Sequence, residues 1–149
     1  MKTWILGFVF ATHLWAVTPF QLPWMNHSQP GTVYRSQDYK GGIYVVEAYF
    51  LGCSYCNDNA PNVKALADRF SGDSRVQVLD VGVDRLDSQY AEWIRRHSPN
   101  HPVLKDSSRV LIRQLGTTGY PSTYVVDCKG QVRYSTSGVW AQSTIEELE

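Results

Sequence analysis

Two cysteines separated by two residues are the feature of this sequence best suited to chemistry. Cys53 and Cys56 follow a β-branched and aromatic run at 43–50, which predicts a buried strand. An amphipathic helix follows them, indicated by apolar residues at intervals of three, four and three: Ala60, Val63, Ala67 and Phe70. The pair therefore lies on the first turn of a helix, where unpaired N–H groups and the helix dipole favour a thiolate on Cys53. This arrangement predicts redox chemistry at sulfur.

The rest of the chain supplies strands and helices that would hold this pair in place. The helix after Cys53 spans about 54–70 and contains Pro61, which removes a helical hydrogen bond and predicts a kink. Further strands are predicted at 76–83, 122–126 and 131–134, helices at 87–97 and 107–115, a short extended piece at 101–104, a hairpin turn at 127–130 and a helix opening near 143. Strands that alternate with helices and end in a hairpin predict the α/β class, with a mixed central sheet flanked by helices.

The N-terminus has the pattern of an export signal. Lys2 supplies a positive charge, and the run that follows, to Val17, is almost entirely apolar. This run is shorter than the ~20 residues that a membrane-spanning helix needs. We therefore interpret residues 1–18 as a signal peptide cleaved near 16–18, with an uncleaved membrane anchor as the alternative. An exported, periplasmic protein works in an oxidising compartment, where a cysteine pair can cycle or remain oxidised.

Length and composition indicate one ordinary globular domain behind this leader. The chain has 149 residues, of which 43% are hydrophobic and 19% charged. Residues 19–38 contain several prolines and predict an extended, mostly irregular lead-in, so the domain itself is expected at 39–149. Basic and acidic residues are equal in number, 14 of each, without a long run of either sign. This balance argues against nucleic acid as a partner.

The order of these parts resembles the thioredoxin superfamily, and most of all its exported TlpA-like thiol–disulfide oxidoreductases. The resemblance covers about residues 39–142. It rests on the 43–50 strand, Cys53-Ser54-Tyr55-Cys56, Pro61, the Tyr120-Pro121 step and the Asp127-x-x-Gly130 hairpin. Pro121 follows Cys53 by 121 − 53 = 68 residues. Such a long gap resembles the extra strand and helix that the TlpA-like group inserts between the cysteines and its cis-proline, so we expect a thioredoxin-like fold with that insertion.

The resemblance also implies roles for residues around the cysteines. Pro121 is expected to be a cis-proline facing the disulfide, with Tyr120 offering its backbone to an extended substrate strand. Its alternative is a trans proline that begins an edge strand. Glu47 stands six residues before Cys53, where a buried carboxylate would accept the proton of Cys56. The alternative for Glu47 is a solvent-facing position at a sheet edge.

Two departures from the family pattern affect the rim of the site. Gly52 stands where a tryptophan is common, which leaves the approach to Cys53 more open. Ser54 and Tyr55, between the cysteines, match neither the pair typical of reducing thioredoxins nor that of strong disulfide oxidases. We expect Gly52, Ser54 and Tyr55 to contact substrate. Because the intervening pair tunes the reduction potential, the direction of electron flow cannot be derived from these residues.

The third cysteine and two histidines are weaker candidates for chemistry. Cys128 lies seven residues beyond Pro121 along a strand, about 23 Å at ~3.3 Å per residue, which predicts a position at the opposite end of the sheet. A free thiol and an intermolecular disulfide both remain open for it. His97 and His101 could suggest a metal together with the cysteines, but Pro99 breaks the helical spacing that a paired-histidine site would use. We expect no metal and no cofactor other than the redox-active disulfide Cys53–Cys56.

The sequence as a whole therefore predicts an exported thiol–disulfide oxidoreductase with Cys53 as nucleophile, Cys56 as resolving cysteine and Glu47 as proton acceptor. Reduction of substrate disulfides is favoured over oxidation. The expected partners are protein thiols and disulfides together with a membrane redox protein, and the expected oligomeric state is a monomer. The alternatives are a disulfide oxidase, and a metal-delivery or partner-binding module that uses the fold without turnover.

Overall fold

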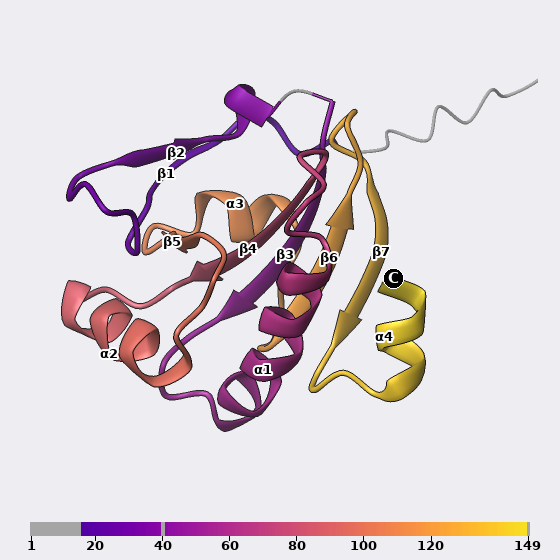
Figure 1. Ribbon diagram of the computed structural model, residues 1–149. Coiled ribbons are helices and arrows are strands. Elements are labelled where there is room, and N and C mark those ends of the chain that lie inside the picture. The colour runs from indigo at the N-terminus through magenta and orange to yellow at the C-terminus, as the bar shows by residue number, and fades with distance from the viewer. Residues whose placement is uncertain (1–15, 40, 149) are drawn as a thin grey trace, which may run out of the picture.

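A five-stranded mixed sheet forms the centre of the computed structural model, which describes residues 16–39 and 41–148 (Figure 1). The strand order is β5-β4-β3-β6-β7. The strands are β3 (Ile43–Tyr49), β4 (Val76–Gly82), β5 (Val103–Lys105), β6 (Ser122–Val126) and β7 (Val132–Ser137). β3, β4 and β5 run parallel, whereas β6 pairs antiparallel with both β3 and β7. The predicted fold class, a mixed sheet flanked by helices, is confirmed.

Helices cover both faces of this sheet, and alternation along β3 assigns its residues to one face or the other. Val45 packs against α1 (Ser54–Arg69) and α4 (Gln142–Leu148), and Tyr49 packs against α1 and α2 (Asp87–His97). Val46 and Ala48 point to the opposite face, where they meet α3 (Val110–Gln114). Between α1, which begins at the cysteines, and Pro121, the chain forms β4, α2, β5 and α3.

The lead-in at 19–38 is not the irregular segment that we expected from its prolines. It forms a two-stranded antiparallel sheet from β1 (Gln21–Pro23) and β2 (Val33–Arg35), followed by the 3-10 helix η1 (Ser36–Tyr39). Leu22 and Tyr34 are buried in the same hydrophobic cluster as α3. Trp24 forms an isolated bridge with Leu104 beside the outer strand of the main sheet. The segment is therefore part of the packed unit.

Two smaller boundaries also differ from prediction. The helix expected from Ser107 begins at Val110, because the buried carboxylate of Asp106 accepts hydrogen bonds from the first three N–H groups of α3. The last helix begins at Gln142 rather than Ser143. Most of the predicted signal peptide, residues 1–15, lies outside the described residues. Within the described part of the chain, no helix is long and apolar enough to cross a membrane.

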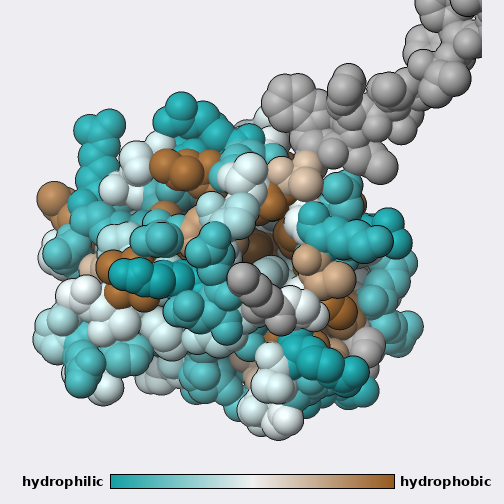
Figure 2. Space-filling view, turned by 90° about the horizontal axis from the view of Figure 1, so that it is seen from above, coloured by the Kyte–Doolittle hydropathy of each residue, from teal (hydrophilic) through white to brown (hydrophobic). Residues whose placement is uncertain are grey.

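The N-terminal end of the described chain packs against the turn between β6 and β7. The backbone N–H of Val17 donates to the carbonyl of Gly130 at 2.7 Å. A side chain at Gly130 would meet the Val17 carbonyl at 2.5 Å, and the φ of +79° at this residue also favours glycine. A hollow of about 260 Å³ opens here, at the end of the molecule seen in Figure 2, where apolar surface lies within a largely hydrophilic face.

Candidate active site

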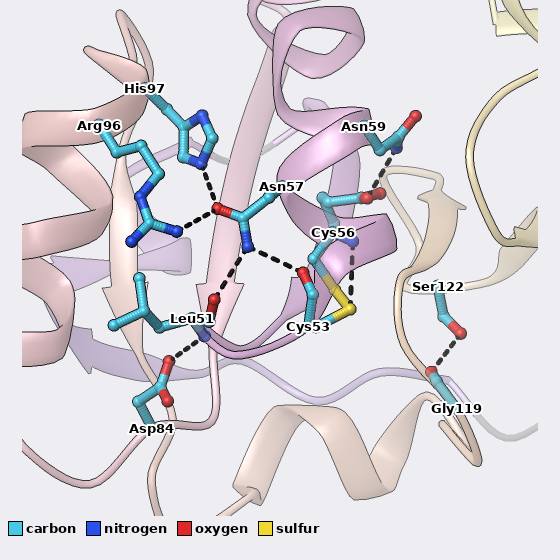
Figure 3. Close-up of a disulfide and its surroundings, with 11 residues drawn as sticks. Leu51, Cys53, Cys56, Asn57, Asn59, Asp84, Arg96, His97, Gly119 and Ser122 are labelled. Carbon is cyan, nitrogen blue, oxygen red and sulfur yellow. Dashed lines mark hydrogen bonds between the residues drawn. A yellow bond between two sulfur atoms is a disulfide. The ribbon is translucent and has the colours of Figure 1, made fainter.

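The cysteine pair lies at the N-terminus of α1, as the sequence predicted (Figure 3). Cys53 is the N-cap residue, and its Sγ accepts a hydrogen bond from the backbone N–H of Cys56 at 3.1 Å. The two side chains form a disulfide with a Cα–Cα distance of 5.2 Å. Cys53 is 7% exposed and Cys56 is 2% exposed. The disulfide therefore presents Cys53 as the sulfur closer to solvent, at the positive end of the helix dipole.

Asn57, which follows the pair directly, fixes the loop before the helix. Its Nδ2 donates to the carbonyls of Leu51 and Cys53 at 2.9 and 2.8 Å. Its Oδ1 accepts from Arg96 Nη1 at 2.9 Å and lies 2.8 Å from His97 Nε2, so that one amide joins the loop to the end of α2 (Figure 3). The sequence analysis did not identify Asn57, although its position next to Cys56 was a signal. Burial and the neighbouring guanidinium of Arg96 lower the pKa of His97.

Glu47 is buried, which rules out the solvent-facing alternative. It lies on the α1 face of β3, between Val45 and Tyr49, and is 3% exposed. Its Oε1 accepts from Asn59 Nδ2 at 2.8 Å, and its Oε2 accepts from the Thr123 hydroxyl. Asn59 lies one turn after Cys56 on α1, so the carboxyl group bonds to the same helix one turn beyond Cys56.

The surroundings of Glu47 favour its neutral form. Burial raises its pKa from 4.5 to about 8, against the lowering effect of the hydrogen bonds from Thr123 and Asn59. Trp140 bonds to both partners of Glu47. Its Nε1 donates to the Thr123 hydroxyl at 2.8 Å, and its backbone N–H donates to Asn59 Oδ1 at 2.9 Å. Sequence reasoning missed Asn59, Thr123 and Trp140, which come from three separate parts of the chain.

A second buried carboxylate stands beside Glu47 in the sheet. Asp80 on β4 is in register with Glu47 and is 2% exposed. Its Oδ2 accepts from Trp93 Nε1 at 3.0 Å and lies 3.2 Å from His101 Nε2. The charge of Asp80 adds to the effect of burial in raising the pKa of Glu47.

Among the predicted substrate-contacting residues, Gly52, Ser54 and Tyr55 adjoin the cysteines in sequence, and Tyr120 packs against the hydrophobic cluster that contains both cysteines. The Tyr120–Pro121 peptide bond is cis. The Tyr120 ring packs edge-on against Phe50, with 5.5 Å between the ring centroids. The pKa of Tyr120 is raised above its ordinary value, because the effect of partial burial exceeds the opposing effect of the nearby Arg109. Gly52 and Ser54 are exposed, and Tyr55 is 64% exposed.

The remaining candidates lie apart from this arrangement. Cys128 is a free, exposed thiol in the β6–β7 turn, bordering the hollow at the opposite end of the sheet. His97 and His101 have different partners, Asn57 and Asp80. Among the described residues, no group of three or more His, Cys, Asp or Glu side chains is arranged to hold a metal ion.

Comparison with known proteins agrees with this geometry. The chain is 22% identical over 125 residues to human NHL repeat-containing protein 2; the match covers 80% of this chain but only 17% of that much longer protein. It is 27% identical over 131 residues to the thiol:disulfide interchange protein DsbE of Pseudomonas aeruginosa, covering 86% of this chain and 68% of the relative.

Among solved structures, a thiol:disulfide interchange protein of the thioredoxin family from Chlorobium tepidum superposes with a TM-score of 0.74 at 18% identity. The superposition covers 89% of this chain and 92% of that one. It confirms the thioredoxin-like fold. Residues 16–135 match the AhpC/TSA family, and because this match spans most of the sequence, the chain belongs to the AhpC/TSA family of thioredoxin-like proteins.

Proposed function

We propose that this protein is an exported thiol–disulfide oxidoreductase that acts mainly as a reductant of protein disulfides. The observation that supports this most directly is the Cys53–Cys56 disulfide at the N-terminus of α1, together with the buried carboxyl group of Glu47, which accepts a hydrogen bond from Asn59 of the same helix. The similarity to DsbE, whose name describes thiol:disulfide interchange, agrees with this activity.

Cys53 is the nucleophile of the reduced protein in this proposal. Its thiolate attacks one sulfur of a substrate disulfide, forms a mixed disulfide and releases the other substrate sulfur as a thiolate, which takes a proton from water. The N–H groups of the first turn, including that of Cys56, stabilise the thiolate. Cys56 is nearly inaccessible and acts second.

The ionised fraction of Glu47 accepts the proton that Cys56 must lose. The Cys56 thiolate then attacks Cys53 Sγ, restores the Cys53–Cys56 disulfide and releases the second substrate thiol, so two electrons have passed to the substrate. An ordinary thiol has a pKa of about 8.5 and an ordinary glutamate about 4.3, so transfer between them would be strongly unfavourable. With its pKa raised to about 8, Glu47 can exchange a proton with a thiol at little cost.

The electrostatics of the site favour reduction over oxidation. A strong disulfide oxidase needs an unusually stable thiolate. Within the described residues, no lysine or arginine side chain bonds to either sulfur, and Glu47 and Asp80 are buried on the same side of the sheet as α1. Burial of the site and the charge of Asp80 disfavour additional negative charge, which favours the disulfide form of the protein and makes the dithiol a better reductant.

Substrate and partners follow from this activity. Tyr120 and Pro121, with Gly52, Ser54 and Tyr55, form the surface on which a substrate polypeptide lies. The redox-active disulfide requires no further cofactor. A reductant in an oxidising compartment must be re-reduced, so a membrane reductase is the proposed electron donor, and the protein acts as a monomer. The apolar N-terminal run supports export, which N-terminal sequencing of the mature protein will test.

The reduction potential of the Cys53–Cys56 pair tests the proposal. The protein with Cys128→Ser is equilibrated in dithiol buffers of known potential, and the fraction of reduced pair is measured by alkylation. A value near the thioredoxin end, about −270 mV, supports a reductant, whereas about −120 mV identifies an oxidase. If no reversible two-electron couple is found, the redox function is wrong, and titration with copper and zinc tests the metal-delivery alternative.

A further inference from the structure

A shallow groove of about 540 Å³ is lined by Phe50, three residues before Cys53, and by Tyr120, and it has no role in the activity proposed above. One part of its lining is apolar, formed by Phe50, Leu86 and Tyr120. The first two are unusually exposed for side chains of this kind, 36% for Phe50 and 62% for Leu86. The other part includes Arg85 and Arg109, both exposed. The groove thus combines an apolar surface with two cationic side chains.

The acidic groups near the groove do not neutralise these arginines. Asp84 also lines the groove, but it is only 8% exposed, and its two oxygens accept hydrogen bonds from the Leu51 N–H and from Gln89. Asp106 is fully buried at the start of α3, and Asp87 pairs with Lys105 at 2.6 Å.

No carboxylate of the described residues pairs with either arginine side chain. Neither the Arg85 nor the Arg109 guanidinium has a hydrogen-bond or ion-pair partner within the described part of the chain. An exposed surface with two unpaired guanidinium groups favours anionic ligands, and a carboxylate can bind such a group through two parallel hydrogen bonds. The groove is therefore electrostatically suited to an acidic side chain.

The groove adjoins the loop that carries the reacting sulfur. The backbone N–H of Cys53 donates to the carbonyl of Phe50 at 3.2 Å, so the residue at the edge of the groove is tied directly to the nucleophile. Tyr120, whose ring packs against Phe50, immediately precedes Pro121. An extended chain advances about 3.3 Å per residue, so a segment bound to Cys53 as a mixed disulfide reaches the groove within a few residues.

We propose that this groove selects substrate polypeptides that carry an acidic residue within about two to four positions of the reacting cysteine. The apolar part of the groove, at Phe50, Leu86 and Tyr120, receives a neighbouring apolar side chain. Arg85 and Arg109 bind the carboxylate. This selectivity deepens the proposed function and rests on it, because it concerns the substrates of the same disulfide.

Two synthetic peptides of about ten residues test the inference. They share one cysteine, held as a mixed disulfide with 2-thiopyridine, and an adjacent leucine, and they differ only in Asp or Lys three positions from the cysteine. Release of thiopyridone by the reduced protein, which carries Cys128→Ser so that the other free thiol does not react, gives a second-order rate constant for each. Exposed ion pairs are individually weak, so we expect the Asp peptide to react about five- to tenfold faster at low salt. High salt is expected to reduce this ratio in the unmodified protein.

Three variants test whether the preference for the Asp peptide arises from the groove. The double variant Arg85→Gln/Arg109→Gln is expected to react equally with both peptides, and Arg85→Glu/Arg109→Glu to prefer the Lys peptide. Arg35→Gln, at an exposed arginine on β2, is the matched control and is expected to keep the original ratio. A protein that reacts equally with both peptides, or a ratio that survives in the double variant, overturns the inference while leaving the proposed function intact. If neither peptide reacts with the reduced protein, the proposed function itself fails.

Discussion

Replacing Glu47 by glutamine is expected to remove most of the pH dependence of stability between about pH 4.5 and 8 that this site imposes on the oxidised protein. Burial, opposed by the hydrogen bonds from Thr123 and Asn59, raises the pKa of Glu47 from 4.5 to about 8. Below pH 4.5 the carboxyl is neutral in both the folded and the unfolded chain, so its full contribution to stability is present. As the pH rises toward 8, the unfolded chain loses this proton while the folded protein keeps it, and stability falls.

The size of this loss follows from the two pKa values. The difference is 8 − 4.5 = 3.5 units, which at ~1.4 kcal/mol per unit corresponds to about 5 kcal/mol above pH 8. At pH 7 the loss is about 3 kcal/mol. Glutamine has the same shape as a protonated glutamate and can still accept from Asn59. The variant is therefore expected to be close to wild type at pH 5 and several kcal/mol more stable at pH 9.

Urea unfolding at pH 5, 7 and 9, followed by tryptophan fluorescence, measures this effect. Both proteins are kept oxidised and carry Cys128→Ser, so that no thiol exchanges with the disulfide at high pH. Glu146→Gln, at an exposed glutamate on α4, is the control and is expected to follow wild type at every pH. If the free energies of unfolding of wild type and Glu47→Gln run parallel from pH 5 to pH 9, the neutral buried state of Glu47 is refuted.

Three further substitutions probe the surroundings of the site. Asn57→Ala removes the amide that joins α1, its preceding loop and α2, and is expected to lower the thermal midpoint by about 5 °C; an unchanged midpoint would mean that this amide does not hold the loop. Gly82→Ala places a Cβ atom 2.6 Å from the Tyr90 ring, so we expect about 1 to 3 kcal/mol of destabilisation in urea, and a neutral effect would contradict the close packing. Asp80→Asn removes the charge next to Glu47 and is expected to lower the pKa of Glu47 in a carboxyl NMR titration; a rise would show that Asp80 does not act through its charge.

The parts of the site that the sequence could predict are those determined by local pattern. The run at 43–50 is apolar except for Glu47 and ends two residues short of Cys53, and the apolar stripe after Cys56 has helical spacing, so the position of the pair at a helix N-terminus follows from nearby residues. The burial of Glu47 follows in the same way, because it interrupts an otherwise apolar strand.

The partners of these residues depend on pairings between distant segments, which local pattern does not contain. Thr123 reaches Glu47 only because β6 pairs antiparallel with β3 in one register, and Trp140 joins them from the loop before α4. The strands β1 and β2 have three residues each, too short for alternation to indicate a strand, and Pro23 weakened the pattern further. Ser107 and Ser108 suggested a helix start that the Asp106 carboxylate moves to Val110.

Different parts of the fold act on the two cysteines of this site. The helix start acts on Cys53, through backbone N–H groups that any residues other than proline at 54 and 55 would still supply. The sheet acts on Cys56 through Glu47, whose proton affinity depends on in-register neighbours on both adjacent strands: Thr123 on β6 and Asp80 on β4. Substitutions at Thr123 or Asp80 change the pKa of Glu47 without altering either cysteine. The rate of the second exchange step can therefore change while the first attack by Cys53 keeps its rate.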